Sequence, residues 1–310
     1  MVSPCVVPEP VEGAKGQLKC HRCPECNGYG CPDMLPGLGG VMGGQNFQAN
    51  VEAWARLSES AAADLDDVEI APCKIRCGPV TGAVENIGFD READFYYPYL
   101  KNAYDAGFGL CIGDGCPDEK LKFGVEAVKK LKEEKGDGAS VNAAFFLKPY
   151  PQERLFERVE WVKPYADYIG IDIDSYNILT MRNLVNLERK SAAQLEEFRK
   201  VSGLPFVIKG VFTAADLELV KEVRPDVVYI SNHGGRVETR HGSTGDFLKA
   251  HTAELKNYCD QIWVDGGIRT RKDIQTALYY GADQVIMARP LIRASFDEHY
   301  KDFCKELFQR

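Results

Sequence analysis

The stretch PFVIKGVFTAADLELVKEVRPDVVYISNH, residues 205–233, decides the fold. It begins and ends with short apolar runs, 205–211 and 227–233, whose β-branched residues predict buried strands. Between them, the segment TAADLELVKEV (213–223) spaces its apolar residues as an amphipathic helix does. A strand, a helix and a second strand in this order form the repeating unit of a parallel sheet.

The same alternation extends in both directions along the chain. The eight apolar runs are 73–77, 109–115, 141–149, 168–174, 205–211, 227–233, 262–268 and 284–290. Helical patterns stand between them, as at 118–134 and 191–201. Eight strands alternating with helices predict an α/β fold, a closed (β/α)8 TIM barrel. A doubly wound open sheet is the alternative, but no G-x-G-x-x-G turn follows the first run.

The beginning of the chain has a different composition. Residues 1–45 are rich in Gly, Pro and Cys, so we expect no regular secondary structure before about Asn46. A helical pattern from about Phe47 to Ala63 then leads into the barrel. We therefore divide the chain into a short irregular N-terminal extension, 1–45, and a barrel domain, 46–310.

The overall composition narrows the class of partner. A chain of 310 residues with 45% hydrophobic content can bury the core of one large domain. Its net charge of -8 and pI near 5.3 provide no basic field for nucleic acid or an anionic membrane, which favours a small-molecule partner. No apolar run approaches the roughly 20 residues that cross a bilayer, and the opening residues lack a signal pattern. We therefore expect a cytoplasmic protein.

Polar residues stand at the C-terminal ends of the predicted strands, within nearly every apolar run. They are Asp114, Lys148, Asp172, Asp174, Lys209, Asn232, His233, Asp265 and Arg289. Any one of them is explained by a solvated loop or a strand-end hydrogen bond. Because barrel enzymes carry their chemistry where the strands end, the whole collection predicts an enzyme site.

Four short motifs share an order and spacing that point to one family. They are I-K-G (208–210), S-N-H-G-G-R (231–236), D-G-G-I-R (265–269) and A-R-P (288–290). Together they resemble the FMN-dependent 2-hydroxy-acid oxidase and dehydrogenase family, which includes glycolate oxidase and flavin-dependent lactate dehydrogenases. The resemblance is strong from about residue 205 to 293. It implies bound FMN and a homo-oligomer, a tetramer in the family.

The last two motifs have the chemistry of a phosphate site. Glycines let backbone N–H groups approach a phosphate, and arginines neutralise it. Loops after strands seven and eight bind phosphate in many barrels, so the motifs alone predict a phosphorylated ligand. The resemblance implies that this ligand is FMN, with Asp265 at the ribityl chain and Lys209 at the N1–C2=O edge of the flavin. The full set of cofactor residues that it implies is Pro79, Thr81, Lys209, Asp265, Gly267, Arg269, Ala288 and Arg289, and Ala288 stands where the family usually has glycine.

His233 and Arg236 form the predicted catalytic pair. A histidine titrates near neutrality and can take a proton from a hydroxyl group, and an arginine can grip a carboxylate with two hydrogen bonds. The resemblance implies that His233 is the general base, that Asp174 orients and charges it, and that Arg236 holds the substrate carboxylate. Lys148 stands where the family has a substrate-binding tyrosine, so we expect it to contact the substrate.

These assignments predict an FMN-dependent oxidoreductase that acts on a small 2-hydroxy acid or a related carboxylate. Two alternatives stay open. One is a flavin-dependent isomerase without net redox chemistry. The other is a barrel that binds FMN without 2-hydroxy-acid turnover, which the missing tyrosines would explain.

Four cysteines in the N-terminal extension form a separate cluster. Cys20, Cys23, Cys26 and Cys31 have the spacing C-x2-C-x2-C-x4-C. Thiolates at this spacing can hold a zinc ion or an iron–sulfur cluster. Free or redox-active thiols are the third reading, and the spacing does not decide among the three.

Overall fold

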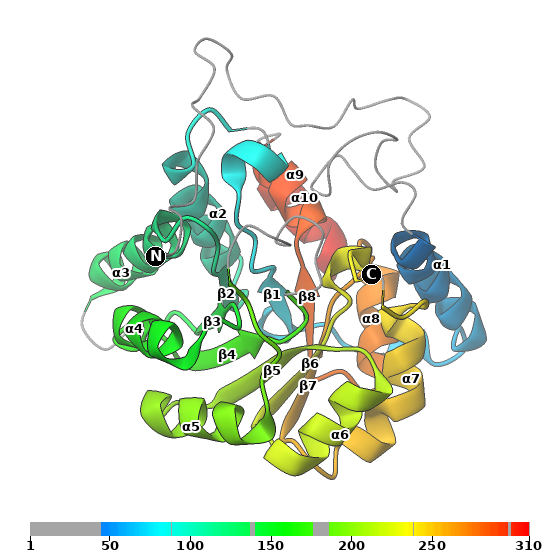
Figure 1. The fold of residues 1–310 in the computed structure, drawn as a ribbon. Helices are drawn as coiled ribbons and strands as arrows, with labels where there is room; N and C mark the ends of the chain where they lie inside the picture. The colour runs from blue at the N-terminus through cyan, green and yellow to red at the C-terminus, as the bar shows by residue number, and fades with distance from the viewer. Residues whose placement is uncertain are drawn as a thin grey trace.

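The computed structural model describes residues 45–309 apart from 88, 137–139, 176–185, 238 and 297–298. Within this range eight parallel strands form one sheet in the order β1-β8-β7-β6-β5-β4-β3-β2 (Figure 1). The strands are β1 (Ile75–Cys77), β2 (Leu110–Gly113), β3 (Ala143–Leu147), β4 (Tyr168–Asp172), β5 (Phe206–Val211), β6 (Val227–Ile230), β7 (Gln261–Val264) and β8 (Gln284–Met287). An isolated parallel bridge between Arg76 and Gly109 joins β1 to β2. The ring of strands closes there, and the predicted TIM barrel is confirmed.

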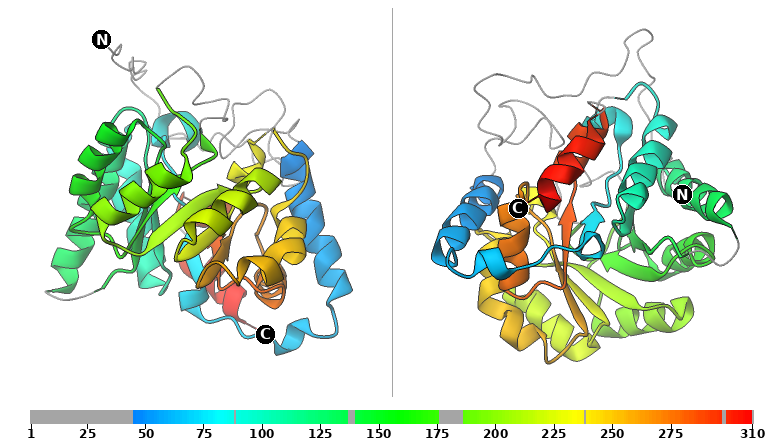
Figure 2. Two further views of the ribbon diagram at one scale, coloured as in Figure 1. Left: turned by 60° about the horizontal axis from the view of Figure 1, so that its bottom comes forward. Right: turned by 180° about the vertical axis from the view of Figure 1, so that it is seen from behind.

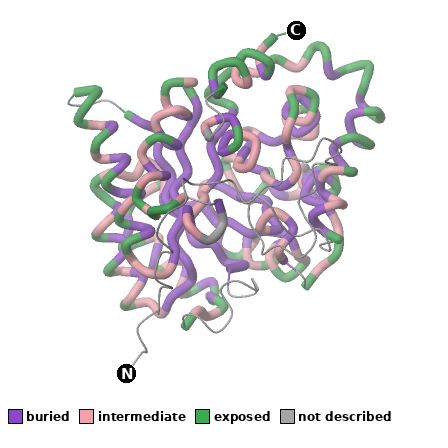
Figure 3. Tube along the Cα trace, turned by 90° about the horizontal axis from the view of Figure 1, so that it is seen from above, coloured by how far each residue is buried: buried purple, intermediate pink, exposed green. Residues whose placement is uncertain are grey.

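Helices alternate with the strands and cover the outside of the barrel. They are α1 (Gln45–Ser60), α2 (Ala93–Asp105), α3 (Glu119–Lys135), α4 (Gln152–Val162), α5 (Ala192–Ser202), α6 (Ala214–Val223), α7 (Thr244–Leu255), α8 (Arg271–Tyr279), α9 (Arg289–Phe296) and α10 (Tyr300–Phe308). Single helical turns occur at η1 (Leu65–Asp67), η2 (Pro72–Lys74), η3 (Ala83–Ile87) and η5 (His233–Gly235). Figure 3 shows the buried strands at the centre and the exposed residues on the outer faces of the helices.

Local sequence explains where several of these helices begin. Ser191, Thr213 and Thr270 precede α5, α6 and α8, and each side chain accepts a hydrogen bond from the backbone N–H of the residue three positions later. The side chain of that later residue bonds back to the backbone of the capping residue, which completes a capping box. Each box satisfies backbone N–H groups that the first helical turn leaves without partners.

Helix α1 lies against the barrel beside α7 and α8 (Figures 1 and 2). Its buried polar residues hold the loops that follow β6 and β7. Trp54 donates from Nε1 to the carbonyl oxygen of Gly266 at 2.7 Å, and Asn50 donates to Asn232 Oδ1 at 2.8 Å. Because α1 contacts these loops directly, it contributes to the placement of every residue that they carry.

The inside of the barrel is filled with side chains. Phe146, Tyr229 and Trp263 lie there within one buried cluster, with ring centroids 5.4 to 6.5 Å apart. Arg76 is fully buried and stacks over the Trp263 ring at 4.1 Å. The interior is therefore a packed core, and polar chemistry is confined to the ends of the strands.

Candidate active site

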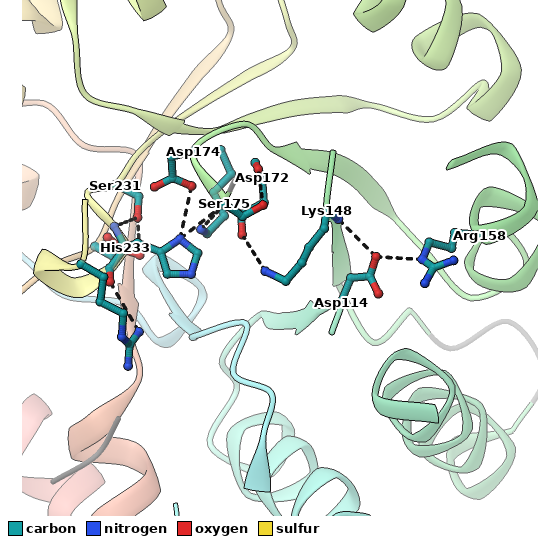
Figure 4. A network of polar contacts seen from close by, with 11 residues as sticks. Asp114, Lys148, Arg158, Asp172, Asp174, Ser175, Ser231 and His233 are labelled. Carbon is teal, nitrogen blue, oxygen red and sulfur yellow. Dashed lines mark hydrogen bonds and ion pairs between the residues drawn. The ribbon is translucent and has the colours of Figure 1, made fainter. Parts of the chain in front are cut away.

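Five ionisable side chains meet where strands β3 to β6 end (Figure 4). Lys148 directly follows β3, Asp172 is the last residue of β4, and Lys209 lies on β5. Asp174 lies in the turn after β4, two residues beyond the end of the strand, and His233 opens η5 after β6. The structure thus brings together residues that are up to 85 positions apart in the sequence (148 to 233).

Asp172 stands between the two lysines. Its Oδ1 accepts a hydrogen bond from Lys209 Nζ at 2.6 Å, and its Oδ2 lies 3.7 Å from Lys148 Nζ. Burial works against charge on Asp172, but Lys209, His233 and Lys148 hold the pKa of this carboxyl well below its usual range. Burial also works against charge on Lys209, but Asp172 and Asp174 raise the pKa of its ammonium group. Both partners of the short ion pair are therefore charged.

His233 faces the two carboxyl groups. Its Nδ1 lies 3.2 Å from Asp174 Oδ1 and 3.7 Å from Asp172 Oδ1. Its φ of 58° is in the left-handed region, which is uncommon for a residue other than glycine. The loop holds it there, because its N–H donates to Ser231 Oγ at 3.1 Å and Asn232 Oδ1 accepts from the N–H of Gly235 at 2.9 Å. Backbone conformations of this kind occur most often at functional sites.

The charge state of His233 follows from its surroundings. Burial is the largest effect and lowers the pKa of the imidazole well below its usual value. Lys209, Lys148 and Arg236 lower this pKa further, and the negative charge of Asp172 opposes them. The imidazole is therefore neutral at neutral pH, which is the form that can accept a proton.

Three arginines gather next to this site. Burial lowers the pKa of Arg289 well below its usual value, and the nearby charges of Arg236 and Arg269 lower it further. Burial also lowers the pKa of Arg236 to about 10. Phe47 of α1 lies beneath two of them, with its ring centroid 4.3 Å from the Arg289 Cζ and 5.8 Å from the Arg269 Cζ. Half-buried guanidinium groups that repel one another are stabilised by an anion.

Two buried polar atoms near the arginines point to the same kind of ligand. Among the residues described, Nε of Arg236 and Oδ1 of Asp265 have no hydrogen-bond partner. The other oxygen of Asp265, Oδ2, accepts from Tyr229 OH at 2.8 Å and from Ser231 Oγ at 3.0 Å, so the carboxyl group is fixed. An anionic group at Arg236 and a hydroxyl group at Asp265 would satisfy these atoms. A substrate carboxylate and the ribityl chain of FMN have this chemistry.

The remaining cofactor residues predicted from the sequence lie at the ends of β1 and β8. A Cβ atom on Gly113 would meet the carbonyl oxygen of Pro79 at 2.5 Å, and one on Gly115 would meet Thr81 Oγ1 at 3.3 Å. Pro79 and Thr81 therefore border the end of β2. The methyl group of Ala288 packs against Gly78, where a Cβ atom would lie 2.6 Å from it. Glycine at position 78 leaves room for the alanine that stands where the family usually has glycine.

The sequence prediction gave no role to Asp114, Arg158 or Asp172. Asp114 and Asp172 were predicted only as polar residues at strand ends. In the structure Asp114 Oδ2 accepts from the fully buried Arg158 Nε at 3.0 Å and from the backbone N–H of Lys148 at 3.2 Å. The pattern I-D-I-D (171–174) was a usable signal for Asp172, because alternate residues of a strand face the same side.

Metal binding was predicted for Cys20, Cys23, Cys26 and Cys31, and these lie outside the described residues. A second candidate is the group formed by Asp172, Asp174 and His233, whose ligand atoms lie within 4.8 Å of one another. Two ammonium groups already compensate Asp172, at 2.6 and 3.7 Å. A divalent cation would have to displace these charges, so we assign no metal to this group.

Comparison with known proteins shows which proteins this chain resembles. The family model described as FMN-dependent dehydrogenase matches residues 157–299. Human 2-hydroxyacid oxidase 2 is 33% identical over 98 residues, which are 32% of this chain and 28% of the relative. The cytochrome-type L-lactate dehydrogenase of Saccharomyces cerevisiae is 29% identical over 194 residues, 59% of this chain and 26% of the relative. The chain thus spans about a quarter to a third of the length of these relatives.

A solved structure agrees with the fold. Mandelate oxidase with (S)-2-phenylpropionate superposes with a TM-score of 0.64 and 19% identity over 89% of each chain. The fold and the site together define an α/β barrel with a group of arginines at the carboxyl ends of its strands. Over residues 157–299 the chain is similar to FMN-dependent dehydrogenases, and the relatives that it resembles include 2-hydroxyacid oxidases. Among the described residues, no helix combines the length and the apolar character needed to cross a membrane.

Proposed function

We propose that this chain is an FMN-dependent oxidoreductase that oxidises a small 2-hydroxy acid, with His233 as the base and Arg236 as the carboxylate clamp. One observation carries the proposal: a neutral, carboxyl-bound histidine lies within the same loop as an arginine whose Nε has no hydrogen-bond partner among the residues described. The relatives named 2-hydroxyacid oxidase and L-lactate oxidase support the substrate class.

His233 has the geometry of a general base. Because its Nδ1 faces Asp174 at 3.2 Å, the tautomer with the proton on Nδ1 satisfies that contact and leaves the lone pair of Nε2 available. The substrate hydroxyl donates its proton to Nε2, and the carbon gives up a hydride. Bound FMN supplies the two-electron acceptor for this oxidation.

Arg236 and the lysines hold the substrate. The Arg236 guanidinium pairs with the substrate carboxylate and orients the hydroxyl toward His233. Lys148 lies 3.7 Å from Asp172, and its ammonium group adds a second positive charge for an anionic substrate. Lys209 is fixed by Asp172 and provides the cation at the flavin.

Two residues would hold the FMN phosphate beside the glycines of the β7 loop. Arg269 and Arg289 supply the positive charge. Gly267 has a φ of 78°, a backbone conformation that residues with a side chain rarely adopt. Asp265 would accept a hydrogen bond from the ribityl chain through its remaining oxygen, and Pro79, Thr81 and Ala288 border the same end of the barrel.

The test is an anaerobic spectroscopic titration of the purified protein. We expect a yellow protein whose visible flavin bands bleach when a small 2-hydroxy acid is added, and 2-methoxy acids of the same size serve as the control because they lack the hydroxyl proton. The Arg236→Met variant should keep the flavin bands and require far more substrate for bleaching. Flavin bands that no 2-hydroxy acid bleaches would favour a barrel that binds FMN without this turnover. A colourless protein that does not take up FMN would contradict the proposal.

The cytoplasmic location and the homo-oligomeric, tetrameric assembly predicted from the sequence stay predictions. Light scattering coupled to size-exclusion chromatography measures the molar mass of the assembly against the 34.5 kDa of one chain.

A further inference from the structure

The two carboxyl groups at the end of β4 have unequal surroundings. Asp172 is bound to Lys209 at 2.6 Å and lies 3.7 Å from Lys148. Asp174 Oδ1 lies 3.2 Å from Nδ1 of the neutral His233, and among the described residues its Oδ2 has no hydrogen-bond donor. Both side chains are buried, with 6% and 7% of their surfaces exposed. The protein therefore compensates a negative charge on Asp172 and does not compensate one on Asp174.

Packing against β5 reinforces this difference. Gly210 has a φ of 97°, and a Cβ atom on it would lie 2.7 Å from the carboxyl carbon of Asp174. The Asp174 carboxyl group thus lies directly on the backbone of β5, where the absence of a side chain makes room for it. A carboxylate that is removed from water without donors is strongly destabilised, whereas the protonated acid is neutral and is buried at much lower cost.

We propose that Asp172 and Asp174 hold a single proton between them, located on Asp174, and that the ionised Asp172 is the positioning residue for Lys148, Lys209 and His233. Two acidic groups this close rarely ionise together, so a shared proton is the expected state when only one of them has cationic partners. Asp172 has lysine partners and Asp174 has none at hydrogen-bond distance, so Asp174 keeps the proton.

The electrostatic directions agree with this geometry. Burial raises the pKa of Asp174, the negative charges of Asp172 and Asp265 raise it further, and Lys209 opposes them. The pKa of Asp172 is held low by Lys209, His233 and Lys148 against the effect of burial. The pair therefore titrates as a unit, with the proton leaving Asp174 only well above the usual range of an aspartic acid.

The shared proton changes the net charge that a substrate meets. Two ammonium groups and one carboxylate, on Lys148, Lys209 and Asp172, leave one net positive charge when Asp174 and His233 are neutral. An ionised Asp174 would cancel it. The neutral acid thus keeps the site attractive to an anion, and the relevance of this charge to a 2-hydroxy acid rests on the proposed function.

The test is infrared spectroscopy of the full-length protein as purified, labelled with 13C in the aspartate carboxyl groups. At pH 7 we expect a C=O stretch of a protonated aspartic acid that shifts on exchange into D2O. The difference spectrum should assign this band to Asp174, because Asp174→Asn removes it. The absence of any protonated-aspartate band in the wild-type protein would overturn the proposal without requiring a variant to fold.

A second variant tests the role of Asp172. In Asp172→Asn the two lysines lose their carboxylate, so Asp174 should ionise in compensation and its band should disappear. Persistence of the Asp174 band in folded Asp172→Asn would show that Asp172 merely packs there, and would contradict the positioning role. Asp265→Asn is the matched control, since it replaces another aspartate of the site, one that is half-buried, and should leave the Asp174 band in place. These spectra need no substrate, so they can fail or succeed independently of the proposed oxidation.

Discussion

The buried arginine of the barrel interior and the half-buried arginines at the carboxyl end have opposite surroundings. In the barrel interior, Arg76 donates to Gln284 Oε1, to Asn142 and to the carbonyl oxygens of Leu110 and Asn142, and it also stacks on Trp263. At the carboxyl end, Arg236 and Arg289 lie close together, and burial lowers the pKa of both. Hydrogen bonds from the protein surround Arg76, whereas the neighbouring positive charges of Arg236 and Arg289 repel each other and favour an anion beside them. A structural arginine thus has its hydrogen-bond partners within the protein, whereas a ligand-binding arginine leaves donors for a ligand.

The largest expected effect concerns turnover at the carboxyl end. His233→Gln should reduce kcat by about 10²–10⁴-fold, the usual contribution of a positioned acid–base group, with the flavin bands and the thermal unfolding temperature retained. Steady-state kinetics with the 2-hydroxy acid that bleaches the flavin measure this change. If the variant turns over as the wild-type protein does, the proton acceptor is another residue, and Lys148 would be the first to replace.

The next effect is on stability and belongs to the barrel interior. Arg76→Met removes a fully buried side chain and leaves the side-chain oxygens of Gln284 and Asn142 without their donor. We expect the free energy of unfolding to fall by about 3 kcal/mol, as measured by urea denaturation. Arg236→Met is the matched variant at the carboxyl end and should unfold at a urea concentration close to that of the wild-type protein or above it. If Arg76→Met and Arg236→Met lost the same free energy of unfolding, the interior arginine and the arginines at the carboxyl end would not differ as described.

A smaller effect is the dependence of stability on pH through His233. Its pKa is lower in the folded protein than in the unfolded chain, so the unfolded chain binds a proton first and the folded state loses stability as pH falls below about 6.5. The His233→Gln variant lacks this loss. Between pH 7 and 5.5 we therefore expect the wild-type protein to lose about 1 kcal/mol more than the variant. Parallel urea curves at both pH values measure the difference, and identical losses would mean that the pKa of His233 is the same in the folded protein as in the unfolded chain.

The sequence predicted the barrel and much of its functional end because these depend on local patterns. Seven of the eight apolar runs contain a whole strand, and β7 begins one residue before its run. The S-N-H-G-G-R and D-G-G-I-R loops directly follow β6 and β7. The strands are shorter than the runs, since the last residues of a run belong to the loops that form the site. For the same reason Asp174, predicted to end β4, lies in the turn beyond Asp172.

The parts that the sequence did not predict depend on contacts between distant segments. The position of Phe47 beneath Arg289 joins residues from opposite ends of the chain, and the contact of Arg158 with Asp114 joins α4 to the end of β2. The bridging role of Asp172 exists only once β3, β4 and β5 are side by side. No local periodicity encodes such contacts, so their energetic consequences appear only in the folded chain.

The central claim is that the arginines at the carboxyl end bind the phosphate of FMN, and the most direct measurement compares FMN with riboflavin, which has the same ring system and ribityl chain but no phosphate. Fluorescence titration of flavin-free protein should give a Kd for FMN at least about 100-fold below that for riboflavin, since charge-assisted hydrogen bonds contribute roughly 1.5–3 kcal/mol each. In Arg289→Met the two flavins should bind with more similar affinities. Equal affinity of the wild-type protein for FMN and riboflavin would contradict the account.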